Sequence, residues 1–154
     1  MILPSEIRVK ASCNGSHDLS GIIFQLRVRS GSKNPYHIYF PKTDSTGVAI
    51  ISSEDFRGQF TDHYEMGLMD YNGTIETAEQ VVTLSLFDRG QMARQRHLLT
   101  AWPLLRHERT NWHSRNEVLD YFLTCLNDSF VLAPQSLTLP ANGQIHVTVA
   151  PNVA

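Results

Sequence analysis

Residues 22–29 read IIFQLRVR, and this stretch decides the fold class because apolar and polar side chains alternate along it. An extended chain with this pattern has two unlike faces. The apolar face is Ile22, Phe24, Leu26 and Val28, and the polar face is Gln25, Arg27 and Arg29. A period of two predicts a strand that buries one face in a core and leaves the other toward solvent.

Outward from this stretch, the same alternation predicts further strands. They cover residues 7–11, 36–40, 48–51 and 82–86, and residues 137–139 and 145–149 form an expected final hairpin around a turn at 140–143. Four strands before residue 52, at a spacing of about ten residues, favour an antiparallel β-sandwich.

Between two of these strands, residues 42–47 read KTDSTG, a polar run flanked by apolar ones. We interpret this run as a corner where the chain reverses. The Asp44 side chain can hydrogen-bond within the turn, and Gly47 can adopt the positive φ that a reversal requires. A binding loop is the alternative interpretation.

A short helix is expected at about residues 53–65, where the pattern changes to helical spacing. Residues 52–55, SSED, combine hydroxyl groups that can cap a helix with acidic residues in the first turn. An aromatic stripe then recurs at every fourth position: Phe56, Phe60 and Tyr64. We expect this stripe to cover an open edge or end of the sheet.

Further helices are expected at about residues 89–127, because Pro103 ends or kinks a first helix and a capping box starts a second. The box is Ser114 to Glu117, and the apolar face behind it is Val118, Phe122, Cys125 and Leu126, ending at about residue 127. These helices lie between strands, so we interpret residues 88–128 as a helical insertion in a single domain of residues 1–154. The predicted fold class is mainly β with helical additions (α+β).

Composition limits the classes of function. The chain has 154 residues, of which 42% are hydrophobic and 18% charged, and two cysteines, which make no disulfide framework. A net charge of −2 gives no bulk electrostatic reason to bind nucleic acid or an anionic membrane. No apolar stretch approaches the roughly 20 residues of a membrane helix, and residues 1–10 lack the order of a signal peptide. We therefore expect a cytoplasmic protein.

The histidines are the candidate metal-binding or catalytic residues. His107 and His113 are six residues apart, whereas a zinc-protease helix requires histidines four apart. A loop could still bring them together with His63 and His97, so a metal-dependent or histidine-based hydrolase is an alternative function. No serine-nucleophile elbow, phosphate-binding loop or dinucleotide motif occurs. We expect no catalytic residue and no cofactor.

The aromatic residues favour protein contact over catalysis, since Tyr and Trp are enriched at interfaces. Alternation places His37 and Tyr39 opposite Ile38 and Phe40. They therefore face water or lie beneath another layer, which would be the inserted helices or a partner chain. The candidates for an interaction surface are His37, Tyr39, Tyr64 and Trp112, and packing in the core is the alternative for each.

One family resemblance combines the central strand, the Thr-Asp-x-x-Gly corner and the short apolar strand that follows it. These residues are Phe24, Leu26, Val28, Thr43, Asp44, Gly47, Val48 and Ile50. They resemble the transthyretin-like (prealbumin-like) sandwiches and the related carboxypeptidase regulatory-like domains, over about residues 5–87. The resemblance implies a sandwich and small-ligand carriage in a dimer formed by edge strands. The hydroxyisourate hydrolases of that family carry a C-terminal Tyr-Arg-Gly-Ser signature that this sequence lacks, so their activity is not implied.

Three functional hypotheses follow. The first is a non-enzymatic protein-binding or accessory module, of the kind found among bacterial accessory proteins, which binds a protein partner or associates with itself. The second is the metal-dependent or histidine-based hydrolase. The third is the small-ligand carrier in a transthyretin-like dimer. None of the three involves a nucleic acid or a membrane as partner.

Overall fold

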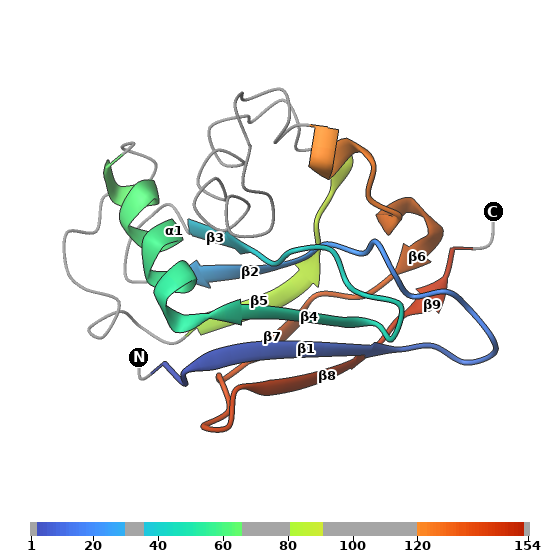
Figure 1. Ribbon diagram of the computed structural model, residues 1–154, viewed down its shortest axis with the longest axis horizontal. Coiled ribbons are helices and arrows are strands. Elements are labelled where there is room, and N and C mark those ends of the chain that lie inside the picture. Colours follow the sequence, from blue (N-terminus) through green and yellow to red (C-terminus); the bar gives the residue numbers. More distant parts are fainter. Residues whose placement is uncertain (1–2, 30–35, 66–80, 91–119, 153–154) are drawn as a thin grey trace.

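The computed structural model describes residues 3–29, 36–65, 81–90 and 120–152, which form two β-sheets packed face to face (Figure 1). The first sheet has the order β4 (Val48–Ser52), β1 (Glu6–Ser12), β8 (Gln144–Thr148). The second has the order β3 (Tyr36–Tyr39), β2 (Phe24–Arg29), β5 (Val81–Leu86), β7 (Gln135–Leu137). A short ribbon pairs β6 (Phe130–Val131) with β9 (Ala150–Pro151). The predicted class, mainly β with helical additions, is confirmed.

The core lies between the two sheets, where the predicted period of two places the apolar side chains. On the first sheet Val9 of β1 lies between Ala49 and Ile145. On the second, Leu26 of β2 lies between Ile38 and Leu84. All of these side chains are buried, and burying a large one contributes about 1.5–3 kcal/mol to folding. The strand predicted from residue 22 begins at Phe24, but Ile22 is still buried.

Two predictions about strand pairing are wrong. Residues 135–137 and 144–148 do not form a hairpin, because β7 pairs with β5 in one sheet and β8 with β1 in the other. In addition, β1 and β8 run parallel, whereas the remaining pairs are antiparallel as predicted. Alternation specifies which residues of a strand face the core, but not which neighbour that strand will take.

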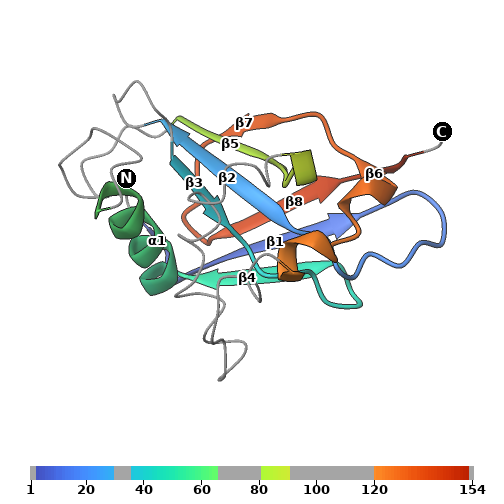
Figure 2. The same cartoon turned by 90° about the horizontal axis from the view of Figure 1, so that it is seen from above.

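Helix α1 (Ser53–Glu65) confirms the predicted helix and lies at the opposite end of the sandwich from β6 and β9 (Figure 2). The Ser52 hydroxyl accepts the backbone N–H of Asp55 at 3.1 Å, as expected of a cap. Phe56 is fully buried in the core, and α1 packs on β3 and β4. The predicted cover over the sheet edge is therefore confirmed at Phe56.

The helical insertion is described only at its ends, and residues 91–119, with the capping box, lie outside the described part. Residues 120–123 are helical, and a 3₁₀ turn, η3, follows at Asn127–Ser129. Phe122 and Cys125 are buried as predicted. The prediction for Leu126 is wrong: its side chain is 44% exposed. The helix ends before it, and the Leu126 N–H donates instead to the Gly21 carbonyl at 2.9 Å.

Candidate functional site: the open edge of strand β8

The two sheets have four edge strands, and one of them, β3, is closed by a side chain of α1. The fully buried Gln59 accepts the Tyr39 N–H through Oε1 at 2.9 Å and donates from Nε2 to the Tyr39 carbonyl at 3.0 Å. This amide therefore replaces the peptide group of a neighbouring strand. No further strand can pair with β3 at this residue.

Edge strand β4 is closed at its start by the 42–47 corner. Asp44 donates its N–H to the Val48 carbonyl at 2.9 Å and accepts the Val48 N–H through Oδ1 at 3.1 Å. Hydrogen bonds from the Thr46 hydroxyl and from the Val48 and Thr46 N–H groups lower the pKa of the Asp44 carboxyl. The observed geometry confirms the interpretation of this run as a corner. Edge strand β7 has only three residues.

Edge strand β8 has five residues, two more than β7. Its hydrogen bonds with β1 show which of its backbone groups point toward β1 and which point away from it. The Gly143 carbonyl accepts the Arg8 N–H at 2.7 Å, and the Val149 N–H donates to the Ser12 carbonyl at 2.8 Å. The Val147 carbonyl accepts the Ser12 hydroxyl at 3.3 Å. Backbone groups of successive residues point to opposite sides of a strand. The N–H and C=O groups of His146 and Thr148 therefore point away from β1.

The open part of this edge has defined limits. At one end the Asn142 Oδ1 accepts the outward Gln144 N–H at 3.0 Å. At the other, the chain beyond Thr148 pairs with β6 through Ala150. Between these limits no described strand pairs with the outer side of β8, which lies at the lower margin of the molecule in Figure 1. The result is an open window of five residues, Gln144–Thr148.

The side chains of the window alternate, and none of them belongs to a lysine, arginine, aspartate or glutamate. Ile145 and Val147 are buried, whereas Gln144, His146 and Thr148 are exposed. Native edge strands are commonly protected by a lysine, a proline or a bulge. The window contains neither lysine nor proline.

A groove adjoins the window at its Thr148 end. Its cavity volume is about 360 Å³, and its lining is mostly apolar, including Val131, Leu132 and Val149. Val131 is 48% exposed. An extended segment that paired with β8 could therefore place an apolar side chain beside the strand as well as form backbone hydrogen bonds.

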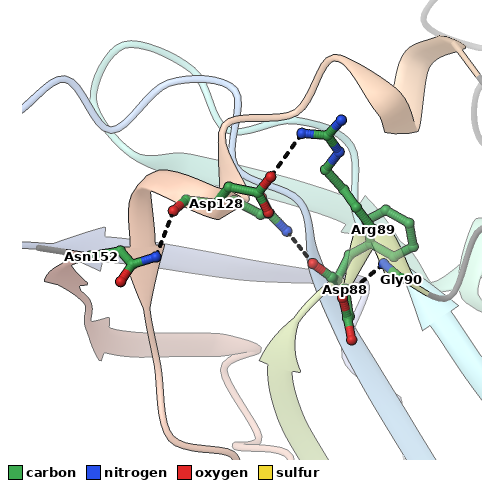
Figure 3. A network of polar contacts seen from close by, with 7 residues as sticks. Asp88, Arg89, Gly90, Asp128 and Asn152 are labelled. Carbon is green, nitrogen blue, oxygen red and sulfur yellow. Dashed lines mark hydrogen bonds and ion pairs between the residues drawn. The ribbon is translucent and has the colours of Figure 1, made fainter. Parts of the chain in front are cut away.

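A second, polar pocket of about 300 Å³ lies beside η3, and Figure 3 shows the contacts around it. Arg89 pairs with Asp128 at 2.8 Å, and the Asn152 amide donates to the Asp128 carbonyl at 2.9 Å. Asp88 accepts the Gly90 N–H at 2.8 Å. The first two contacts join distant segments of the fold, and the third lies within one turn. Among the described residues no three His, Cys, Asp or Glu side chains are grouped as metal ligands.

The structure places two of the four predicted surface residues inside the molecule. Tyr39 is 1% exposed and His37 is 8% exposed. Phe122 covers Tyr39 with an edge-to-face contact, the ring centroids 5.2 Å apart. The alternative that these residues lie beneath another layer is therefore observed, and Tyr39 does not itself present a surface to a partner. Tyr64 lies on α1, but its side chain is not among the described atoms, and Trp112 lies outside the described residues.

The histidines proposed as metal ligands are not brought together in the described structure. His97, His107 and His113 lie outside the described residues, and His63 is placed on α1 only by its backbone. The hydrolase hypothesis stays a prediction.

The β8 window was missed by reasoning from the sequence, although its signal was present. Residues 145–149 alternate as expected, but the preceding turn at 140–143 suggested a hairpin that would have covered one side of the strand. The separation of β7 and β8 into different sheets leaves that side open.

In the comparisons with known proteins, no family model, no curated protein and no solved structure matches this chain. Among the described helices, none is long and apolar enough to cross a membrane.

Proposed function

We propose that this protein is a non-enzymatic binding module that accepts an extended protein segment as an additional strand along β8. The observation that carries the proposal is the open window, in which His146 and Thr148 direct backbone N–H and C=O groups away from β1. Strand addition uses such groups for affinity and adjoining pockets for specificity. The groove at the Thr148 end supplies an adjoining pocket.

The contrast with the other long edges supports the proposal. Gln59 closes β3 and Asp44 occupies the outward groups of Val48 on β4. At the β8 window the corresponding groups of His146 have no such partner among the described residues. A partner therefore covers β3 at Tyr39 and β4 at Val48, whereas His146 and Thr148 of β8 keep outward backbone groups that can pair with an added strand.

We also propose that the fold is transthyretin-like. It is supported by the two-sheet sandwich and by the corner, where Gly47 has a φ of 81° and Asp44 accepts hydrogen bonds within the turn. The resemblance implies association through edge strands, which agrees with a binding role for β8.

The test is selection of extended peptides from a display library on the immobilised protein, followed by affinity measurements on two variants. His146→Pro removes an outward N–H but no bond to β1, and proline is tolerated where a strand N–H faces solvent. His146→Ala removes the same side chain and keeps the N–H. We expect selected peptides to bind His146→Ala normally and His146→Pro about 10-fold or more weakly, since a backbone hydrogen bond contributes about 1 kcal/mol and the proline ring obstructs pairing.

Equal binding of the peptides to both variants would place their site elsewhere and contradict the proposal. Unfolding midpoints in urea serve as the control, because a large drop for His146→Pro alone would indicate damage to the sheet. Thr148→Pro, which also removes an outward N–H, then provides the second variant.

A further inference from the structure

Two Asn-Gly pairs lie in described loops of the chain, and their hydrogen bonding differs. Asparagine is a thermolabile residue, and a glycine after it leaves the linking backbone nitrogen unshielded because glycine has no side chain. One pair is Asn14–Gly15, in the loop after β1, and the other is Asn142–Gly143, in the turn before β8. A third pair, at residues 72–73, lies outside the described residues.

The Asn142–Gly143 pair is fixed on both its backbone and its side chain. The Gly143 N–H donates to the Pro140 carbonyl at 2.9 Å, and the Asn142 Oδ1 accepts the Gln144 N–H at 3.0 Å. Gly143 also packs directly on β1, because a Cβ there would clash with the Glu6 carbonyl oxygen. The side chain of this pair cannot turn toward the glycine nitrogen without breaking these contacts.

The Asn14–Gly15 pair has none of these restraints. Both residues are exposed and lie in a bend, where Gly15 has a φ of 89°. Within the described part of the chain, neither the Gly15 N–H nor the Asn14 side-chain amide forms a hydrogen bond. The His17 ring leaves ordinary van der Waals space beside Gly15, its Nε2 being 3.4 Å from the position of a Cβ. The Asn14 amide is therefore able to reach the Gly15 nitrogen.

We propose that Asn14 is a modification site, whose side-chain amide converts to aspartate or isoaspartate without an enzyme. The Gly15 nitrogen bonds to the Asn14 Cγ, the Cγ–Nδ2 bond breaks, and Nδ2 leaves as ammonia with the proton of the Gly15 N–H. Water then opens the resulting succinimide ring. Cleavage between the nitrogen and Cγ gives aspartate, and cleavage between the nitrogen and the Asn14 backbone carbonyl carbon gives isoaspartate. Water is the one co-reactant, and orientation of the side chain governs the rate.

The modification alters the groove beside β8. Asn14 lines this groove together with Val131, Leu132 and Val149. Either product places a carboxylate, and so one more negative charge, in a wall that is mostly apolar. The inference concerns covalent chemistry in the β1 loop, and it does not depend on the proposed strand binding.

The experiment is peptide mapping by mass spectrometry of the full chain after timed incubation at mildly alkaline pH, with digestion at acidic pH to limit further deamidation. The same incubation in guanidinium chloride is the matched control, since the unfolded chain keeps both sequences and loses their contacts. In the folded chain Asn14 should lose its amide at least about 10-fold faster than Asn142, because two hydrogen bonds restrain the second pair. Unfolding should accelerate Asn142 about 10-fold or more and change the rate at Asn14 by less than about 3-fold.

Equal rates at Asn14 and Asn142 in the folded chain would overturn the inference. So would an acceleration of Asn14 on unfolding as large as that of Asn142, because the fold would then protect both sites. Aspartate without isoaspartate at position 14 would contradict the ring intermediate. Residues 72–73 are mapped separately, so their modification does not enter the comparison.

Discussion

At Gly47 the backbone conformation and the packing together exclude a side chain. Its φ is 81°, in the left-handed region that glycine alone adopts without cost, and a Cβ there would lie 2.9 Å from the Ala11 carbonyl oxygen. The Ala11 N–H also donates to the Gly47 carbonyl at 2.8 Å. The corner therefore joins β4 to β1 by a close approach of two backbones.

Gly47→Ala should lower the free energy of unfolding by about 1 kcal/mol or more, and Gly47→Val by more. Gly58 in α1 is the matched control, because nothing lies within 4 Å of its Cβ position and alanine favours a helix. Gly58→Ala should raise the same quantity by up to about 1 kcal/mol. Urea denaturation measures both, and equal effects of the two substitutions would contradict this account of the corner.

At the scale of elements, two buried amides hold neighbouring segments to strand backbones. Gln59 attaches α1 to β3 through both Tyr39 backbone groups. Asn127 attaches η3 to the start of β2, accepting the Ile23 N–H at 2.8 Å and donating to the Ile23 carbonyl at 2.9 Å. It also donates to the Phe87 carbonyl at 2.7 Å. Gln59 thus pairs both Tyr39 backbone groups, and Asn127 pairs the Ile23 N–H and the Phe87 carbonyl. The Ile23 carbonyl also accepts the Phe87 N–H at 2.9 Å.

Gln59→Glu tests this role, because a carboxylate cannot donate to the Tyr39 carbonyl. We expect a loss of about 2–3 kcal/mol of stability at pH 7, from a buried unsatisfied acceptor next to a buried charge. Burial favours the neutral acid, so the loss should diminish as pH falls toward 4 and the acid regains its proton. Arg57→Gln on the exposed side of the same helix is the control. A pH-independent loss would show that packing, not the donor, is the cause.

The elements were largely predictable because their signals are local. The period of two marks each strand of the core, and residues 52–55 mark the start of α1 at the position observed. The two amides were not predictable, because Gln59 and Tyr39 are 20 residues apart and Asn127 and Ile23 are 104 apart. Nothing in either local sequence specifies the partner.

At the scale of the whole molecule, the second sheet is covered on its outer face. Tyr39, Phe87 and Phe122 form an aromatic layer there, with the centroids of Phe87 and Phe122 4.9 Å apart. Burial raises the pKa of the Tyr39 phenol well above its usual value. The ionisation of Tyr39 therefore indicates whether this aromatic layer buries it. In the folded state the phenol stays protonated at a pH where the phenol of the unfolded chain ionises.

The sign of the pH effect follows from that difference. Above about pH 10 the unfolded state loses the Tyr39 proton and the folded state keeps it, so stability falls as pH rises. Tyr39→Phe removes this linkage, and its free energy of unfolding should fall less steeply between pH 9.5 and 11, by up to about 1.4 kcal/mol per pH unit. Denaturant titrations of both proteins at several pH values provide the measurement. Parallel pH profiles would contradict the burial of the phenol.

The sequence by itself determined which residues face the core, where α1 begins and where the chain turns at Gly47, because those properties depend on neighbours a few positions away. Only the tertiary structure decided that β7 and β8 enter different sheets, that β8 runs parallel to β1, and that Tyr39 lies beneath Phe122. Strand partners are selected by the packing of the whole chain, since backbone hydrogen bonds carry no information about sequence. The open edge of β8, on which the proposed function depends, is a product of that selection.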